Sequence, residues 1–383
     1  MTDIPRIAVI GAGPGGLLCA RVLQQRGLSV TVYDADRSAT DRDQGGTLDL
    51  HADSGQLAMS QAGLLDAFMA LARPEGQSMT FMDQHGEVKK QFTHTPGDTD
   101  APEIDRGQLR QMLAESLEPG TVQWDHKLRS ATSLGAGTHR LRFANGAQTD
   151  VDLLIGADGT WSRVRPLVTD AVPEYSGVSY LDVQYQNVDV RHPEIARMVG
   201  QGQLFIKDGQ GHGVVVQRNS GGVIRGYVFM KKPLNWAEQA KLDTGDASAV
   251  HRFLLSEFSG WTPELYPFMT DSDGPYINRP IMLLPAPLTW EPTPGVTLLG
   301  DAAHVMAPFG GQGANLALLD AANLACAVAE ETSIDAAIAR YEAQMLPRAG
   351  ALAVQSNAAQ VKFFGGQGPA ASHLAPVSLE LAQ

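Results

Sequence analysis

Two short runs of apolar residues end in glycine, and a third segment repeats their pattern. Residues 7–10 lead into Gly11, residues 151–156 end at Gly156, and residues 297–299 lead into Gly300. Short apolar runs bounded by glycine are typical of strands that are buried on both faces of a parallel sheet. The pattern therefore predicts strand, glycine turn and helix at three separate places along the chain.

Apolar residues recur at helical spacing between these strands. This spacing predicts a helix in each of five segments, the last of them kinked by Pro347: 17–25, 54–72, 106–117, 246–258 and 335–364. Residues 78–98 alternate and predict strands followed by a loop. Residues 122–124 and 141–143, with the turn at Asn145-Gly146, predict a small antiparallel meander.

Residues 175–232 have a different pattern. Short alternating runs are separated by Gly, Asn and Asp, which predicts an antiparallel sheet in a second domain. The chain as a whole is therefore expected to be α/β, with a parallel sheet and a separate antiparallel sheet.

Composition narrows the class of protein. The chain has 383 residues with 43% hydrophobic and 19% charged residues, a net charge of −13 and a pI near 5.2. This acidic balance argues against nucleic acid or an anionic membrane as a partner. The sequence has no secretory leader pattern and no long apolar run, so we expect a cytoplasmic protein. Its two cysteines, Cys19 and Cys326, form no C-x-x-C motif, and no metal-ligand cluster is evident.

The first glycine segment has the spacing of a dinucleotide-binding turn. Gly11, Gly13 and Gly16 allow a tight turn, a close approach of backbone to a pyrophosphate, and close packing of the next helix. The N–H groups that open this helix point toward such a phosphate. Asp34 ends the second strand, where a carboxylate accepts a hydrogen bond from a ribose hydroxyl.

The other two segments predict ligand contacts at the ends of buried strands. Asp158-Gly159 follows one strand, and Gly300-Asp301 follows the other. Open α/β sheets bind ligands at these strand ends. The third segment continues through His304 to the string Pro308-Phe309-Gly310-Gly311-Gln312-Gly313-Ala314-Asn315.

Together the three segments resemble the flavin-dependent aromatic hydroxylases, which are single-component FAD monooxygenases. The resemblance spans nearly the whole chain and is closest to the tetracycline-inactivating branch. The strings that carry this closer likeness are 44–51 with 54–56, 103–106 with 109–110, 253–261 and 341–345.

The resemblance implies a domain organisation. A Rossmann-like FAD-binding domain with a parallel sheet accompanies an antiparallel-sheet substrate domain and a long C-terminal bridging helix. The corresponding residues are 1–75, 101–170 and 276–332 for the FAD-binding domain, 76–100 and 171–275 for the substrate domain, 333–364 for the helix and 365–383 for a loosely ordered tail.

The resemblance also implies which residues bind FAD. Gly11, Gly13, Pro14 and Gly16 hold the pyrophosphate, and Asp34 holds the adenosine ribose. Arg106 and Asp301 hold the ribityl–pyrophosphate stretch, and Asp49 contacts FAD near the flavin. The remaining residues of this set are Gly300, Pro308, Gly311, Gln312, Gly313 and Ala314. The N–H groups of Gly311 to Gly313, at a helix start, would offset negative charge on reduced flavin.

NADPH is implied as a transient reductant. Arg42 stands where the tetracycline branch has an arginine assigned to NADPH, and Asp158 belongs to a motif that serves both FAD and NADPH. In the family, a flavin C4a-hydroperoxide transfers oxygen to an electron-rich carbon, so no protein nucleophile is needed. Pro308, Phe309 and Gly310 would form a dry wall beside the flavin, since water destroys this intermediate.

The substrate side departs from the family. Asn187 replaces a glutamine, Arg225 falls where the branch has a substrate-binding histidine, and the family's substrate-binding arginine has no counterpart. Val215 and Phe363 complete the candidate substrate residues. Arg225 is either a substrate contact or a solvated strand residue, and Phe363 either lines the pocket entrance or packs in the core. His304 is expected to pack behind its loop rather than act as a base.

The expected function is hydroxylation of an aromatic or enolised polycyclic compound by a monomer that uses FAD, NADPH and O2, with tetracyclines as candidate substrates. One alternative is a phenolic acid or secondary metabolite as substrate. Another is a flavoprotein that sequesters a ligand without turnover.

Overall fold

The computed structural model describes residues 5–366, which form two compact units. Residues up to 73, 103–174 and 282–354 make up unit 1, and residues 74–102, 175–281 and from 355 onward make up unit 2. Most of the tail expected at 365–383 lies outside the described residues. Within the described part, no helix combines the length and the apolar character needed to cross a bilayer.

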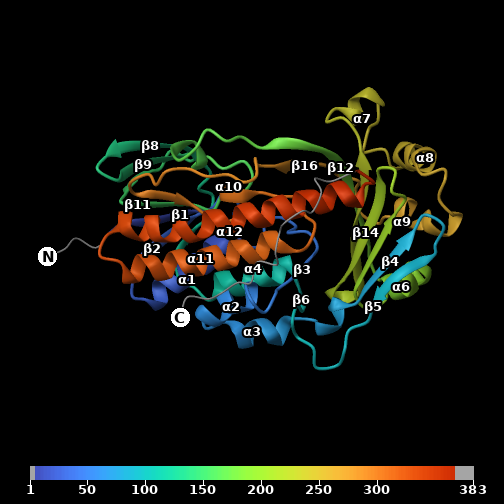
Figure 1. Cartoon of the computed structure of the whole chain (residues 1–383), viewed down its shortest axis with the longest axis horizontal. Helices are drawn as coiled ribbons and strands as arrows, with labels where there is room; N and C mark the ends of the chain where they lie inside the picture. The colour runs from blue at the N-terminus through green and yellow to red at the C-terminus, as the bar shows by residue number, and fades with distance from the viewer. Residues whose placement is uncertain (1–4, 367–383) are drawn as a thin grey trace. The chain divides into compact units, whose positions relative to one another are not determined.

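Unit 1 is built on a parallel sheet of five strands in the order β17-β11-β1-β2-β7. The strands are β1 (Ile7–Ile10), β2 (Val30–Tyr33), β7 (Val122–Gln123), β11 (Leu153–Gly156) and β17 (Val296–Leu298). All four residues of β1 and of β11 are buried, which accounts for their unbroken apolar sequence. The predicted parallel α/β sheet is therefore confirmed, and Figure 1 shows it among the helices of this unit.

The helices of unit 1 cover the sheet. They are α1 (Pro14–Gln25), α2 (Gly55–Gln61), α3 (Leu65–Leu71), α4 (Arg106–Glu115), α10 (Asp301–His304) and α11 (Gln312–Glu330). Helices α1, α2 and α11 pack on one another, as Figure 1 shows. A single helix was expected over 54–72, but the chain forms α2 and α3, because Gly63 turns into the left-handed region at φ 64° and ends the first.

Two smaller sheets complete unit 1. One is antiparallel with the order β10-β9-β8, and the other pairs β3 with β6. The strands are β3 (Thr47–Asp49), β6 (Glu103–Asp105), β8 (Leu128–Gly135), β9 (Thr138–Phe143) and β10 (Gln148–Val151). The meander expected to include 122–124 consists of β8, β9 and β10 instead. Strand β7 pairs in parallel with β2, because α4 provides the crossover that such pairing needs.

Unit 2 is built on a seven-stranded sheet in the order β16-β12-β15-β14-β13-β4-β5. The strands are β4 (Met79–Asp83), β5 (Val88–Phe92), β12 (Glu174–Tyr185), β13 (Gln203–Lys207), β14 (His212–Asn219), β15 (Val223–Lys231) and β16 (Asn278–Leu283). The predicted antiparallel pairing holds for β12, β15, β14 and β13. Strand β4 joins β13 in parallel, although the two strands lie far apart in the sequence.

One face of this seven-stranded sheet is covered by short helices. These are α5 (Val188–Arg191), α6 (Pro193–Val199), α7 (Trp236–Gln239), α8 (Ala247–Glu257) and α9 (Pro267–Thr270). Leu181, Leu204, Val214 and Val228 point into that core. The side chains that alternate with them, including Asp182, Phe205, Val215 and Tyr227, share the opposite face.

Helix α12 (Ile334–Phe363) matches the expected C-terminal helix and continues through Pro347. Its residues up to 354 belong to unit 1 and the rest to unit 2. In unit 1, Ile338, Tyr341 and Met345 are fully or almost fully buried in the core that contains the parallel sheet. The predicted amphipathic spacing therefore corresponds to a packed face.

Candidate cofactor site

The three glycine-rich segments meet in unit 1. A Cβ atom on Gly11 would lie 2.3 Å from the carbonyl oxygen of Ala157, and one on Gly15 would lie 2.9 Å from that of Ala317. The backbone N–H of Leu299 donates to the carbonyl of Gly156 at 2.9 Å. Because Gly11 and Gly15 have no side chains, the first glycine-rich segment contacts the other two. Such proximity is what the sequence predicted for three segments that share one ligand.

Two helices in this region begin without a side-chain cap. Gly13 precedes α1, and Gly311, at φ 67°, precedes α11. A Cβ on Gly13 would meet nothing within 4 Å, so the turn in front of α1 is open. Free N–H groups and the helix dipole favour an anion at such an end. These two helix starts therefore fit the pyrophosphate and the electron-rich edge of a flavin.

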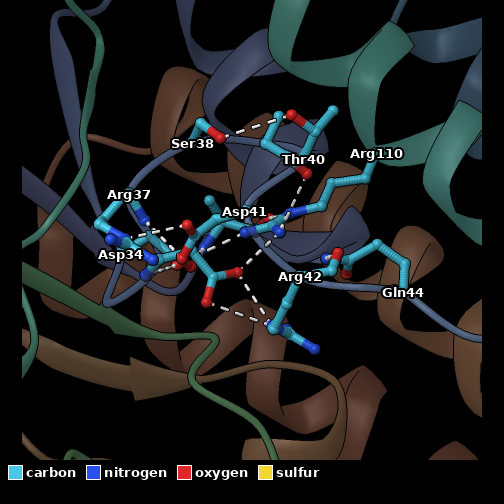
Figure 2. Close-up of polar contacts among 11 residues, drawn as sticks. Asp34, Arg37, Ser38, Thr40, Asp41, Arg42, Gln44 and Arg110 are labelled. Carbon is cyan, nitrogen blue, oxygen red and sulfur yellow. Dashed lines mark hydrogen bonds and ion pairs between the residues drawn. The ribbon is translucent and has the colours of Figure 1, made fainter.

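A buried arginine, which lies within the family string 109–110 but was assigned no role from the sequence, organises the first segment. Arg110 on α4 is 1% exposed, and its Nε donates to the carbonyl of Ala12 at 2.8 Å. Its other nitrogens reach Asp36 at 2.7 Å and Asp34 at 3.4 Å. Figure 2 shows the Arg110 guanidinium among the polar groups of the 34–44 loop. Arg110 therefore joins the glycine turn to the loop that follows the second strand.

Two residues of this loop, Asp34 and Arg42, are predicted to bind cofactors. Both already make hydrogen bonds or ion pairs within the protein. Asp34 accepts from the backbone N–H groups of Ala12 at 2.5 Å and Asp36 at 2.8 Å. A carboxylate has lone pairs for further acceptance, so a ribose contact by Asp34 stays a prediction. Arg42 pairs with Asp36 at 2.9 Å, and its side chain is 62% exposed. The Arg42 side chain is thus accessible from solvent.

The second segment is held to the third by another buried arginine. Arg165 donates to the carbonyls of Ala302 at 2.7 Å and Thr160 at 2.8 Å. Asp158 folds back on its own turn, because it accepts from the Ser162 hydroxyl at 2.6 Å and from the Arg163 N–H at 2.7 Å. Burial raises the pKa of Asp158, against the lowering effect of these hydrogen bonds.

The loop that carries Asp49 is tied to the start of α11 by Asn315. The fully buried Asn315 side chain donates to the carbonyl of Asp49 at 2.8 Å and accepts from the N–H of His51 at 2.9 Å. A Cβ on Gly311 would lie 2.5 Å from an Asp49 oxygen. Asp49 and the uncapped helix start are therefore neighbours, as expected if both contact one flavin.

The remaining predicted cofactor residues lie on the same unit. Arg106 opens α4 with an exposed side chain, and its N–H donates to Gly46 at 3.1 Å. Asp301 is exposed at the start of α10. In the loop between α10 and α11, Pro308 and Gly310 are exposed and Phe309 is half-buried. Their role as a dry wall stays a prediction.

His304 belongs to a buried ionic network behind the third segment. Its Nε2 lies 2.6 Å from Asp320, which also accepts from Arg348 at 2.8 Å and from the Gly300 N–H at 3.3 Å. Burial acts to raise the pKa of Asp320, but its ion pairs with His304 and Arg348 outweigh burial and hold that pKa below its ordinary value. His304 is thus packed behind its loop, where we expected it.

The candidate substrate residues of unit 2 lie mainly on the sheet face opposite its core. Cross-strand register places Tyr227 between Asp182 and Val215, and it places Arg225 between Gln184 and Gln217. The rings of Tyr180 and Tyr227 meet edge to face at 5.0 Å. This face therefore combines aromatic and polar groups around Val215 and Arg225.

Two of the candidate substrate residues, Asn187 and Phe363, lie outside the strands of this sheet. Asn187 lies in the turn after β12, exposed and in the left-handed region, where it opens α5 rather than pointing from the sheet face. Phe363 ends α12 and packs over the backbone of Gly213 on β14. The structure thus separates Asn187 from Val215 and Arg225, and it places Phe363 near Val215.

Comparison with known proteins identifies the family. A family model described as an FAD binding domain matches residues 5–250 and 293–356. The curated protein Monooxygenase penA of Penicillium thymicola is 28% identical, over 90% of this chain and 92% of that protein.

Two solved structures share the fold. One is Klebsiella pneumoniae HpxO complexed with FAD and uric acid, with a TM-score of 0.77 and 24% identity over 92% of this chain and 87% of that chain. The other is tetracycline destructase Tet(55), with a TM-score of 0.73 and 22% identity over 97% and 93%.

These matches place the chain in a class. It belongs to the FAD binding domain family, so its cofactor is FAD. With penA as a relative over nearly its whole length, the chain is an FAD-dependent monooxygenase. The resemblance to single-component FAD hydroxylases is thereby confirmed.

Replacement of Gly16 tests how tightly the FAD turn is packed. A Cβ on Gly16 would lie 2.0 Å from the carbonyl oxygen of Gly11. We expect Gly16→Ala to lower the free energy of unfolding by about 1–3 kcal/mol, as overpacking does, and to lower FAD content. Urea unfolding and the ratio of flavin to protein absorbance measure the two effects.

Two glycine variants serve as controls for this experiment. Gly107→Ala on α4, where a Cβ meets nothing within 4 Å, should leave the FAD content unchanged and should not lower the free energy of unfolding, since alanine favours a helix over glycine. Gly13→Ala should leave the apoprotein's stability unchanged and weaken FAD binding. Equal stability of the Gly16→Ala and Gly107→Ala proteins would refute the packing argument.

Proposed function

We propose that this chain is an NADPH- and O2-dependent hydroxylase of an aromatic or enolised polycyclic compound. The observation that supports it most is the meeting of the three glycine-rich segments beside the uncapped start of α11. A plain dinucleotide dehydrogenase would use the first segment and leave Asp158 and Asp301 without a role.

The proposed roles follow the geometry of unit 1. The turn before α1, with Gly11, Gly13, Pro14 and Gly16, holds the pyrophosphate, and Asp34 holds the ribose. Arg106 and Asp301 hold the ribityl–pyrophosphate stretch. Arg42, with its exposed side chain, and Asp158 serve NADPH.

The start of α11 is the proposed electrostatic element. Bound FAD supplies the redox chemistry, taking electrons from NADPH and activating O2. Backbone N–H groups from Gly311 to Ala314 stabilise negative charge at that position, each by an amount on the order of 1 kcal/mol. Pro308, Phe309 and Gly310 exclude water, which limits loss of the activated oxygen as peroxide.

Tetracyclines are the proposed candidate substrates. The likeness of the fold to tetracycline destructase Tet(55) supports this choice, and so do the aromatic groups on the open sheet face of unit 2. On that face, Val215 and Arg225 would contact the substrate, with Phe363 at the entrance and Asn187 at the end of β12.

A second candidate substrate is a phenolic acid. Arg225 has the neutral amides of Gln184 and Gln217 as its cross-strand neighbours. A guanidinium in such surroundings suits a carboxylate, which it binds through paired hydrogen bonds.

One panel tests these proposals. FAD-loaded protein is mixed with NADPH and a tetracycline, a phenolic acid or no substrate, and NADPH loss, drug absorbance and product mass are followed. Turnover should raise NADPH oxidation and add one oxygen atom to one compound. Unchanged drug absorbance with bound FAD removes tetracycline, and an unchanged KM for the acid in Arg225→Ala removes the second candidate. Ligand binding with neither stimulated NADPH oxidation nor oxygen insertion for any compound would point to a ligand-sequestering flavoprotein.

A further inference from the structure

A histidine to which the proposed function gives no role lies beside the start of α11. His51 is in the turn that joins β3 to α2, and its Nε2 lies 3.0 Å from Oδ2 of Asp49. The same Asp49 oxygen lies 2.5 Å from the position that a Cβ on Gly311 would take. One carboxylate oxygen therefore contacts both the His51 ring and the residue that precedes the uncapped helix.

The fully buried Asn315 side chain fixes this arrangement. Its oxygen accepts from the N–H of His51 at 2.9 Å and from that of Gly55 at 3.1 Å. Its nitrogen donates to the carbonyl of Asp49 at 2.8 Å and to that of Gly311 at 2.9 Å. One amide thus holds the backbone on both sides of the contact, so the His51–Asp49 pair is a preformed feature of unit 1.

The surroundings of His51 favour its protonated form. The hydrogen bond to Asp49 raises the pKa of His51 above its ordinary value of 6.5, against the lowering effect of burial. The charges of Asp49, of Asp53 in the same turn and of Glu103 on β6 raise this pKa further, whereas α11 contributes the neutral Asn315. Protonated His51 and Asp49 form a neutral pair, whereas neutral His51 leaves the carboxylate charge uncompensated.

The charge of this pair acts at the helix end that is proposed to stabilise the flavin. The N–H groups at the start of α11 attract negative charge, and an uncompensated Asp49 carboxylate repels it. Charges beside the electron-rich edge of a flavin change how readily it accepts electrons. A proton on His51 therefore offsets the Asp49 charge and favours reduction.

We propose that His51, acting through Asp49, is a positioning residue that sets the reduction potential of the bound flavin and the pH dependence of that potential. The inference rests on the proposed placement of the flavin at the start of α11. Negative charge on the flavin and a proton on His51 favour one another, because the coupling between two sites is reciprocal. The potential should therefore fall more steeply with pH where His51 loses its proton.

The test measures the midpoint potential of the FAD-loaded full chain against a reference dye, without NADPH or substrate. The range is about pH 6 to about pH 9, which extends above the ordinary histidine value. At the acid end, His51→Gln should lower the affinity for reduced relative to oxidised flavin by about fivefold, as expected for one charge at a partly exposed position. This change lowers the potential of a two-electron couple by about 20 mV. The difference should shrink as the pH rises and wild-type His51 becomes neutral.

His51→Lys separates charge from ring geometry. Lysine stays protonated up to its ordinary pKa of about 10.4, so this variant should keep the wild-type potential at about pH 6 and hold it to higher pH. It also tests the proposal if His51→Gln binds FAD too weakly for a titration.

The matched control is His192→Gln. Its Nε2 lies 2.9 Å from Asp273, but both residues belong to unit 2, which contains none of the residues proposed to bind FAD, so the potential should not change. An unchanged potential in His51→Gln, an equal lowering in His51→Lys, or the same shift in His192→Gln would overturn the proposal. Failure of the proposed function appears separately, as absent NADPH-dependent oxygen insertion in a protein that shows these potential shifts.

Discussion

Arg110→Ala is expected to purify without FAD and to unfold more readily than the wild type. The Arg110 side chain is 2% exposed, and it joins the Ala12 carbonyl to the carboxylates of Asp34 and Asp36. Its removal takes from Asp34 its ion-pair partner and leaves Asp36 paired with the exposed Arg42 alone, and breaking a buried pair costs about 3–5 kcal/mol. Because Asp34 and Asp36 keep some exposure, we expect a loss near the lower end of that range.

Two further variants sharpen this test. Arg42 pairs with the same Asp36, but its side chain is 62% exposed, so Arg42→Ala should change stability by no more than about 0.5 kcal/mol and retain FAD. Arg110→Lys keeps the charge but loses the guanidinium geometry, so it should fall between the two. The measurements are flavin absorbance after gel filtration and urea unfolding of the apoprotein. Full FAD retention by Arg110→Ala would contradict the role given to Arg110.

Asp320→Asn is expected to destabilise unit 1 strongly. Asp320 is fully buried and accepts from His304, Arg348 and the N–H of Gly300. An amide cannot balance the Arg348 charge, and breaking a buried pair costs about 3–5 kcal/mol. Because Gly300 precedes Asp301, we also expect weaker FAD binding. Thermal and urea unfolding, with and without FAD, measure both effects.

The pH dependence of this loss has a definite sign. The pKa of Asp320 is lower in the folded protein than in the unfolded chain, where it is about 3.9. The stabilisation is therefore present above that pH and is lost as the pH falls through the folded value. The difference between the wild type and Asp320→Asn should be large at neutral pH and shrink in acid below about pH 4.

Asp335→Asn provides the matched control. Asp335 also accepts from a glycine N–H, that of Gly295 at 3.0 Å, but it is exposed. We expect its replacement to change stability little. A cost for Asp320→Asn no larger than that of Asp335→Asn would show that the buried network contributes little.

The glycine-rich segments were predictable because their signal is local. Strands β1 and β11 are apolar at every position, and the turns after them need glycine where Gly11 contacts Ala157. A ligand at the carboxyl ends of parallel strands follows from topology alone. The family match to an FAD binding domain agrees with that interpretation.

The burial and the hydrogen-bond partners of the charged residues were harder to predict from the sequence. Arg110 shares a helix face with the buried Leu113, three residues further on, so its burial had a detectable signal. Arg165 lies in an irregular segment with no periodicity, and its acceptors are carbonyls of residues such as Ala302. A local sequence pattern therefore cannot predict that these backbone carbonyls accept hydrogen bonds from Arg165.

The sequence by itself determined the class of cofactor and the strands and helices that surround it, because glycine spacing and apolar periodicity act between near neighbours in the chain. Only the tertiary structure decided that β4 lies parallel to β13, that Arg110 and Arg165 join separate segments, and that Phe81, Phe205 and Phe363 enclose one pocket. The physical reason is that cross-strand register and the pairing of buried charges depend on which distant segments pack together, and many pairings are compatible with the same local pattern.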